Sequence, residues 1–414
     1  MSQFPTVKIS DLVQSKEAIL QTGPFGTQLK ASDYVESGIP VINVRNIGFG
    51  NIRPEKLEFL SEKMVEKLSI HKLRYGDIVF GRKGAVERHT YINNDADGWI
   101  QGSDCLRLRI CSERINNKFV SYYFMTTAHQ NWMKALCSFG STMASLNQNI
   151  VKLISLPLPP IEIQNKIAAI LSAYDDLIEN NKRRIALLEN LAEEIYREWF
   201  VRFRFPGYQE AKFEKGIPVE WKKGTLGQIT NLIMGQSPKS EYYNDIGDGF
   251  PFHQGVGTYG NRYPINKTFC STSGRKAKKG SILFSVRAPV GRLNIANTDM
   301  IIGRGLSALT HKSGYNSYLY YLLKTVFSNE DIIGNGSIFN SVCKNDLQKF
   351  GLLIPKTALI KDFNEKISKI DRQIDIFESS NEILEKTKKS LLGRLISGKL
   401  SVEDLDIQFP PSML

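Results

Sequence analysis

The chain has 414 residues, of which 42% are hydrophobic and 23% charged, and its formal net charge is +12. These values are ordinary for a globular protein, and they exclude a mainly disordered, collagenous or disulfide-scaffold chain. At roughly 150 residues per domain, the length suggests two or three domains. The sequence pI near 9.3 favours a polyanionic partner, either nucleic acid or an anionic membrane surface.

The cysteines and the N-terminus indicate a reducing compartment. There are five cysteines, an odd count, and no C-x-x-C pair, which argues against a disulfide framework and the common zinc spacings. The chain does not open with a basic segment followed by an apolar run, and no stretch approaches about 18 uninterrupted apolar residues. We therefore expect reduced, buried cysteines, a cytoplasmic location and no membrane partner.

The most informative feature is a two-fold internal repeat. Ser145 and Ser341 are separated by 196 positions, and so are Asn149 and Asn345. Longer matches surround them: 140–141 with 336–337, 156–159 with 352–355 and, at a slightly larger offset, 76–80 with 280–284. The last pair each has a turn glycine followed by a short apolar run, which predicts a buried strand. The long period indicates duplication of a whole domain rather than a solenoid.

Two long segments carry the spacing of a helical seam. Mostly apolar residues recur at alternating steps of three and four from Ile163 to Trp199 and from Leu359 to Leu395. The average step of 3.5 is typical of a coiled coil. A helix of about 40 residues extends roughly 60 Å, which is too long for the core of one small domain. We expect the two helices to pair and to hold two globular parts apart; two unrelated surface helices are the alternative.

The rest of the sequence mixes glycines, aromatic residues, short β-branched runs and brief helical stretches, which predicts an α+β fold with many loops. Pro159 and Pro160 suit the start of the first long helix, and Gly398 suits the end of the second. The predicted division is a globular domain over 1–155, a spacer helix over 156–205, a second globular domain over 206–352, and a second spacer helix with a C-terminal tail over 353–414.

The chain carries no convincing catalytic or metal site. Gly255–Gly260 matches G-x-G-x-x-G, but Asn261–Pro264 follows and cannot open the apolar helix of a dinucleotide site. There is no P-loop, and the Asn/Asp-Pro-Pro-Phe/Tyr tetrapeptide of an adenine amino-methyltransferase is missing. Glu220–Lys222 lacks the upstream Pro-Asp pair of a nuclease, and the five histidines have no metal-ligand spacing. We predict no catalytic residue and no metal.

Basic and amide-bearing loops occur in both predicted globular domains. Arginine and lysine can recognise guanine in the major groove, and asparagine and glutamine can recognise adenine. We predict DNA contacts from Arg45, Asn46, Arg82 and Lys83 in the first domain, and from Gln254, Arg262, Arg287 and Arg292 in the second. Three lysines, Lys276, Lys278 and Lys279, are expected to contact phosphates. Solvated loops are the alternative, but recurrence in both halves of a basic chain favours DNA.

These features together resemble the specificity subunit of a type I restriction-modification system, over essentially the whole chain. The most specific stretch runs from Leu156 to Ile167 and continues through Asp175–Asn181 to Trp199–Val201. Supporting segments are Gly23–Gly26, Gly38–Ile42 and Phe139–Thr142. The second half departs from the pattern, because Lys356 replaces a proline and Lys388 interrupts the apolar stripe.

The resemblance implies that each globular part is a target recognition domain for one half of a split, asymmetric DNA sequence. It implies an antiparallel coiled coil that fixes the gap between the half-sites, and a prokaryotic, nucleoid-associated protein. Two modification subunits would methylate adenine with S-adenosylmethionine, and restriction subunits with ATP and Mg would translocate and cleave DNA. This chain itself would be non-catalytic and bind no cofactor. The alternative is a coiled-coil scaffold with only non-specific DNA affinity.

The seam sequences predict a register. Each seam contains one asparagine, Asn181 or Asn381, and a buried unpaired amide is costly, so the two should face each other. In an antiparallel pair this register also sets Trp199 near Phe363, Ile167 near Leu395, Ile185 against Phe377 and Lys388 along the ring of Tyr174. Beside the first seam lies a second apolar row, Ile170, Leu177 and Leu191, expected to meet either a modification-subunit helix or the chain's own globular domain.

Overall fold

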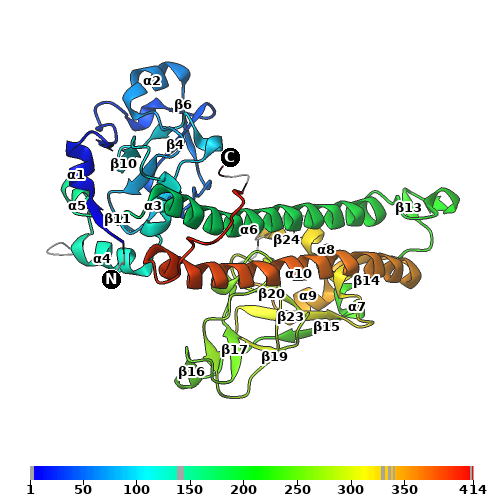
Figure 1. Cartoon of the computed structure of the whole chain (residues 1–414). Helices are drawn as coiled ribbons and strands as arrows, with labels where there is room; N and C mark the ends of the chain where they lie inside the picture. Colours follow the sequence, from blue (N-terminus) through cyan, green and yellow to red (C-terminus); the bar gives the residue numbers. More distant parts are fainter. Residues whose placement is uncertain are drawn as a thin grey trace. The chain divides into compact units, whose positions relative to one another are not determined.

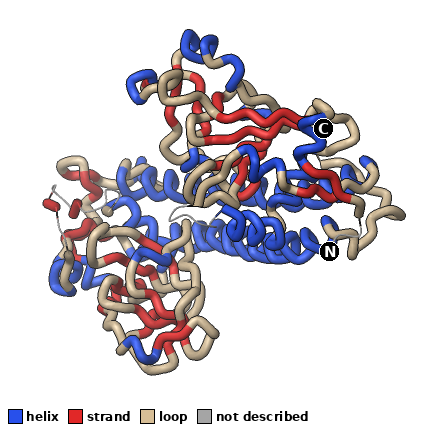
Figure 2. The backbone as a smooth tube through the Cα atoms, turned by 90° about the vertical axis from the view of Figure 1, so that its left-hand side faces the viewer, coloured by secondary structure: helices blue, strands red, loops and turns tan. Residues whose placement is uncertain are grey.

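The computed structural model describes residues 4–137, 144–327, 332–333, 337–338, 341–410 and 413. The chain folds as two compact units, one built from residues 1–181 and 380–414 and the other from residues 182–379. In both units short strands and helices are joined by long loops (Figure 2). The predicted segments at 139–142 and at Gly336 lie outside the described residues.

The first unit contains two sheets and a two-stranded ribbon. The larger sheet has the order β2 (Ala18–Thr22), β10 (Cys105–Ile110), β7 (Ile78–Gly81), β8 (His89–Tyr91), β5 (Phe49–Gly50). The smaller sheet has the order β3 (Tyr34–Val35), β6 (Glu58–Leu60), β4 (Ile39–Ile42), β9 (Ile100–Gln101), and the ribbon pairs β1 (Thr6–Lys8) with β11 (Ser155–Pro157). The short helices are α1 (Ile9–Gln14), α2 (Glu62–Lys67), α3 (Asn117–Phe124), α4 (Thr127–Cys137) and α5 (Gln148–Lys152).

The second unit repeats this plan. One sheet has the order β15 (Thr230–Met234), β23 (Leu306–His311), β20 (Ile282–Ser285), β21 (Leu293–Ile295). The other has the order β16 (Tyr243–Asn244), β18 (Phe269–Cys270), β17 (Phe250–His253), β22 (Met300–Ile302), β19 (Lys276–Ala277). Two-stranded ribbons pair β14 (Lys222–Thr225) with β26 (Gly351–Ile354), β12 (Phe213–Glu214) with β13 (Ile217–Pro218), and β24 (Ile332–Ile333) with β25 (Ser337–Ile338). The short helices are α7 (Leu226–Ile229), α8 (Asn316–Val326) and α9 (Lys344–Lys349).

The two-fold repeat and the α+β class predicted from the sequence are confirmed. The order β2-β10-β7-β8 in the first unit corresponds to β15-β23-β20-β21 in the second. A parallel pair also occurs at the same place in each unit, β4 with β9 and β17 with β22, and the first unit has a further parallel pair, β5 with β8. The predicted buried strands are β7 and β20, in which all four residues of each are buried. Their apolar runs suit them to this central position, where neighbours cover both faces.

The long helices are α6 (Ile161–Tyr196) and α10 (Thr357–Ile396). In the first unit the start of α6 lies beside the end of α10 (Figure 1), and Ile167 and Leu395 belong to one apolar core. In the second unit, Trp199, just after α6, packs edge-on to Phe363 of α10, with ring centroids 5.7 Å apart. The pairing is antiparallel in each unit. Gly398, which follows α10, has φ +78°, the left-handed conformation that commonly ends a helix. The predicted boundaries at 155, 205 and 352 remain predictions.

The two seam asparagines meet within the first unit. Asn181 Nδ2 donates a hydrogen bond of 2.9 Å to Asn381 Oδ1, and Asn381 is buried. Near the other part of the seam, in the second unit, the guanidinium of Arg184 lies 5.5 Å from the centroid of the Phe377 ring. The amide pair therefore lies in the predicted register, in which Asn181 faces Asn381.

The environment of Lys388 differs from the expectation. The predicted neighbour was the ring of Tyr174. The ammonium instead forms an ion pair of 2.5 Å with Asp175 and lies 5.1 Å from the centroid of the Tyr122 ring. The Tyr122 hydroxyl also donates to Asp175, at 2.7 Å. A buried ammonium needs an acceptor as well as an apolar stem contact, and the carboxylate next to the seam residue supplies it.

Two histidines belong to the first unit's core rather than to a reactive site. His89 Nε2 lies 2.8 Å from Ser121 Oγ, and its ring packs edge-on to Phe124. The ring of His129 lies 4.8 Å from that of Phe124. Burial lowers the pKa of each imidazole to about 3, so both are neutral structural side chains.

Substitution of one seam asparagine should destabilise the protein. Asn381→Leu leaves the Asn181 amide without its partner, which should lower the free energy of unfolding by about 1–3 kcal/mol in denaturant titrations. The double variant Asn181→Leu/Asn381→Leu should recover most of that loss, because no unpaired amide remains. If the single variant is as stable as the parent, the amide pair does not contribute to the register.

Candidate nucleic-acid interface

Four loops of the first unit are fastened together by backbone hydrogen bonds; we call them loop cluster 1. They follow β2, β4, β7 and β9 and comprise residues 23–30, 43–48, 82–88 and 102–104. The bonds are Gly23 N to Cys105 O at 2.9 Å, Gly102 N to Ile42 O at 2.9 Å, and Arg82 N to Asp104 O at 2.8 Å. A Cβ at Gly23 would lie 2.0 Å from Gly102 O, so glycine is required for this close approach.

The second unit fastens the equivalent loops in the same way; we call them loop cluster 2, comprising residues 235–242, 254–260, 286–292 and 303–305. Its bonds are Gly235 N to Leu306 O, Gly303 N to His253 O, and Val286 N to Gly305 O, each 2.9 Å. A Cβ at Gly235 would lie 2.1 Å from Gly303 O. The bridges between Lys83 and Ser145 and between Arg287 and Ser341 are also equivalent, which aligns Lys83 with Arg287.

Loop cluster 1 brings together three of the predicted DNA-contacting residues. Arg45 and Lys83 are exposed, and Arg82 is half-buried. Arg45 and Lys83 each lie against a carboxylate: Arg45 is 2.7 Å from Glu58, and Lys83 is 3.2 Å from Asp104. Phe25 of the same loop cluster is also exposed; its 67% exposure is unusual for a large apolar residue, and it was not predicted as a contact.

Loop cluster 2 brings together Gln254, Arg287 and Arg292, all of them exposed. Gln254 Oε1 accepts a hydrogen bond of 2.7 Å from Ser237 Oγ. The cluster also contains an exposed arginine that the sequence reasoning missed, Arg304, whose backbone N–H donates to Ser237 Oγ at 3.2 Å. The available signal was its place between two glycines, because glycine on both sides lets a loop approach a phosphate backbone.

Two predicted DNA-contacting residues are corrected by their burial. Asn46 is fully buried, and its amide donates to Arg53 O and Glu55 O to shape the loop. Arg262 is 2% exposed and pairs with Asp371 at 2.5 Å and Glu189 at 3.3 Å. Burial alone would lower the pKa of Arg262, but Asp371 raises it above its ordinary value. Both side chains are buried and bonded within the protein, so neither can contact DNA in this structure.

The predicted phosphate contacts and the second apolar row are placed as follows. Lys278 is exposed and pairs with Asp299 at 3.0 Å, whereas the ammonium of Lys276 lies 3.7 Å from the centroid of the Phe250 ring. Ile170 packs on the core of the first unit. Leu177 and Leu191 on α6 are 52% and 50% exposed, so neither is covered by its own unit.

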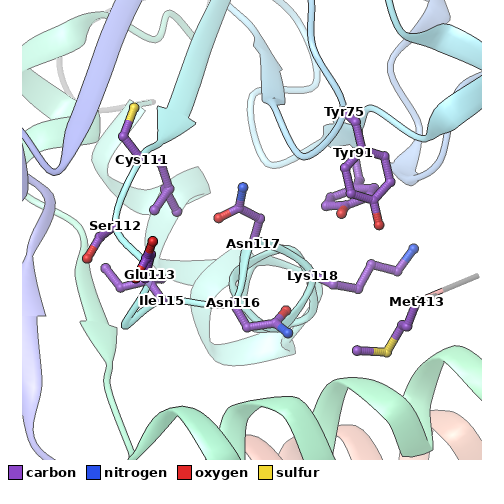
Figure 3. A pocket seen from close by; sticks show the side chains of 11 residues that line it. Tyr75, Tyr91, Cys111, Ser112, Glu113, Ile115, Asn116, Asn117, Lys118 and Met413 are labelled. Atoms are coloured by element: carbon purple, nitrogen blue, oxygen red, sulfur yellow. The ribbon is translucent and has the colours of Figure 1, made fainter. Parts of the chain in front are cut away.

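A hollow of about 330 Å³ in the first unit is separate from loop cluster 1 (Figure 3). It is lined by Tyr75 and Tyr91, by residues 110–113 and 115–118, and by Met413. The Lys118 ammonium lies 4.5 Å from the centroid of the Tyr91 ring. Among the described residues no group of three or more His, Cys, Asp or Glu side chains is arranged to hold a metal ion. None of the described helices is long and apolar enough to span a membrane.

Comparison with known proteins agrees with this geometry. The family model described as type I restriction modification DNA specificity domain matches residues 1–190 and 218–391. The putative type I restriction enzyme MjaX specificity subunit of Methanocaldococcus jannaschii is 30% identical over 374 residues, 88% of each chain. The type I restriction enzyme HindI specificity subunit of Haemophilus influenzae is 20% identical, over 79% of this chain and 87% of the relative.

A solved structure shares the fold. The crystal structure of a type I restriction-modification system S subunit from M. genitalium superimposes with a TM-score of 0.58 and 16% identity. The match covers 95% of this chain and 96% of that chain.

The different burial of Arg262 and Arg287 predicts opposite mutant phenotypes. Arg262→Ala leaves Asp371 and Glu189 facing a cavity, and should lower the free energy of unfolding by about 3 kcal/mol. Arg287→Ala should change stability by no more than about 0.5 kcal/mol, because the side chain is exposed, but should weaken binding to duplex DNA. Thermal unfolding and fluorescence anisotropy measure the two effects. Loss of DNA affinity in a stable Arg262→Ala variant would contradict the structural role.

Proposed function

The chain belongs to the family of type I restriction-modification DNA specificity proteins, and on that premise we propose that it selects the DNA sequence on which partner subunits act. The observation that carries the proposal is the repetition of one fastened loop cluster in each unit, with exposed cationic or amide side chains in both. Each cluster would contact one half of a split target. We place the protein in the cytoplasm, with the DNA that it recognises.

The residue types in the two clusters fit this task. Arginine can form two hydrogen bonds with guanine, and glutamine can form two with adenine, whereas lysine and arginine also neutralise phosphates. One wrong base pair costs roughly 1–3 kcal/mol, so a single small surface discriminates only modestly. Two loop clusters on one chain add their contributions, and because the two clusters differ in sequence the target would be asymmetric.

The chemistry would be supplied by other subunits. A specificity subunit has a non-catalytic role, and we propose that two modification subunits use S-adenosylmethionine to methylate adenine within the selected site. Restriction subunits with ATP and Mg would cleave DNA that lacks this mark. The half-exposed leucines of α6, Leu177 and Leu191, offer an apolar surface for a helix of a modification subunit.

Substitutions in the two loop clusters should alter different halves of the target. Replacing Gln254 by Ala should relax a position in one half-site, and Arg82→Ala should relax a position in the other, because the residues belong to different units. Sequencing of methylated adenines in cells that carry the complete system reads both half-sites at once. The alternative scaffold function requires that neither substitution changes the methylated sequence.

The proposed partner surface is tested by charge substitution. Leu177→Glu/Leu191→Glu should abolish co-purification with the modification subunits, because a charge cannot be buried in an apolar helix contact without a partner. The matched control is Ile383→Glu, since Ile383 is on the other long helix, α10, and is 65% exposed. Assembly that survives the double substitution assigns the contact to another surface.

A further inference from the structure

Two exposed cations of loop cluster 1, Arg45 and Lys83, are held by carboxylates of the same unit. Glu58 binds two loop residues at once, because it accepts from Asn43 Nδ2 at 2.6 Å and pairs with Arg45 at 2.7 Å. Asp104 pairs with Lys83 at 3.2 Å, and its backbone carbonyl accepts from Arg82 N at 2.8 Å. Arg45 and Lys83 are therefore partly neutralised before any DNA arrives, whereas Lys30, the last residue of the first loop, is exposed and is in none of the ion pairs among the described residues.

The second unit has no carboxylate at either equivalent position. In the sheet of the first unit Glu58 lies opposite Val41 of β4. The residue of β17 equivalent to Val41 is Phe252, whose backbone N–H donates to Thr268 O, so Thr268 occupies the position of Glu58. The backbone carbonyl of Asp104 accepts from Arg82 N. In the second unit the equivalent hydrogen bond runs from Val286 N to Gly305 O, at 2.9 Å, so Gly305 occupies the position of Asp104. Threonine and glycine therefore replace the two acids.

Neutral contacts fasten loop cluster 2 instead. Gly305 N donates to Gln254 O at 3.1 Å, and Gln254 Oε1 accepts from Ser237 Oγ at 2.7 Å. Across the part of the chain that the structure describes, neither Arg287 nor Arg304 has a carboxylate within 4.0 Å. The two loop clusters thus share a backbone arrangement but differ in the charge that they present.

We propose that Glu58 and Asp104 compete with DNA phosphates for Arg45 and Lys83, so that the first, sequence-independent contact with DNA is made by loop cluster 2. This inference rests on the proposed function. Loop cluster 1 would contact DNA closely only where correct base contacts offset the loss of two ion pairs. Glu58 and Asp104 are then specificity-determining residues that suppress binding to wrong sequences.

The strength of these ion pairs suits such a competition. All four side chains are between 38% and 63% exposed, and ion pairs at that exposure are weak enough to exchange for phosphate. Each carboxylate also repels the negatively charged backbone. Each phosphate contact makes the slope of log affinity against log salt more negative by about 0.9. Relative to 1 M salt, that contact raises affinity about eightfold at 0.1 M salt. Release of one cation should therefore be measurable.

The test is binding of the full chain to a random-sequence duplex over a range of KCl concentrations. Glu58→Gln and Asp104→Asn should each raise affinity for this duplex about fivefold at 0.1 M salt and steepen the salt dependence. Affinity for a duplex with the target sequence, identified from the methylated adenines, should rise less. The ratio of target affinity to random-duplex affinity therefore falls. Arg45→Ala in the Glu58→Gln background should remove the gain.

The matched control is Glu17→Gln. Glu17 pairs with Arg114 at 2.6 Å, and both lie at the opposite ends of β2 and β10 from loop cluster 1. This control changes the net charge by the same amount and should leave affinity for the duplex within about twofold. A gain equal to that of Glu58→Gln would overturn the proposal by showing a general charge effect.

Other outcomes separate this inference from the proposed function. If the parent chain binds the duplex and neither acid substitution raises its affinity, the competition is wrong and the proposed function stands. If the substitutions weaken binding to the target duplex but not to the random duplex, the carboxylates accept hydrogen bonds from cytosine amino groups, and the proposal is overturned. If the parent chain binds neither duplex, the proposed function fails. In the parent, Arg287→Ala or Arg304→Ala should weaken binding to the random duplex more than Lys83→Ala.

Discussion

Each unit depends on side chains from both long helices to complete its apolar core. In the first unit Ile167 of α6 and Leu395 of α10 join residues of the sheet and of α3. In the second, Phe363 of α10 is fully buried among Trp199, Phe200 and Tyr318. Residues 228 positions apart in the first unit (Ile167 and Leu395) and 164 apart in the second (Trp199 and Phe363) therefore belong to one core in each case. A globular part cannot move on its helices without exposing this apolar surface, so the loops are held as firmly as the helices.

The features that sequence predicted well are periodic or local. The seam spacing of α6 and α10 located both helices, and the single asparagine of each seam located the amide pair, because helical geometry converts residue number directly into position. The strands β7 and β20 were identifiable from a turn glycine and an apolar run. The repeat itself was visible because short matches recur at similar offsets in both halves.

The features that sequence missed depend on contacts between distant residues. Arg262 has the local composition of a DNA-binding loop, but its partners Glu189 and Asp371 are 73 and 109 residues away. Lys388 interrupts an apolar seam because Asp175 and Tyr122 enclose it, and Tyr122 belongs to α3, outside the helix pair. No periodic pattern encodes such partners. Local composition did not separate Asn46, which shapes its loop, from Arg45, which faces solvent.

The hydrogen bond between Asn181 and Asn381 also has a consequence for the fidelity of helix pairing. The next apolar register of two such helices is one heptad away, a slip of about 10 Å at 1.5 Å per residue. In a slipped pair each amide would face a seam position without its partner. The amide pair therefore penalises the alternative register that would still bury apolar side chains, and it does so at the end of the first unit, where its two asparagines lie.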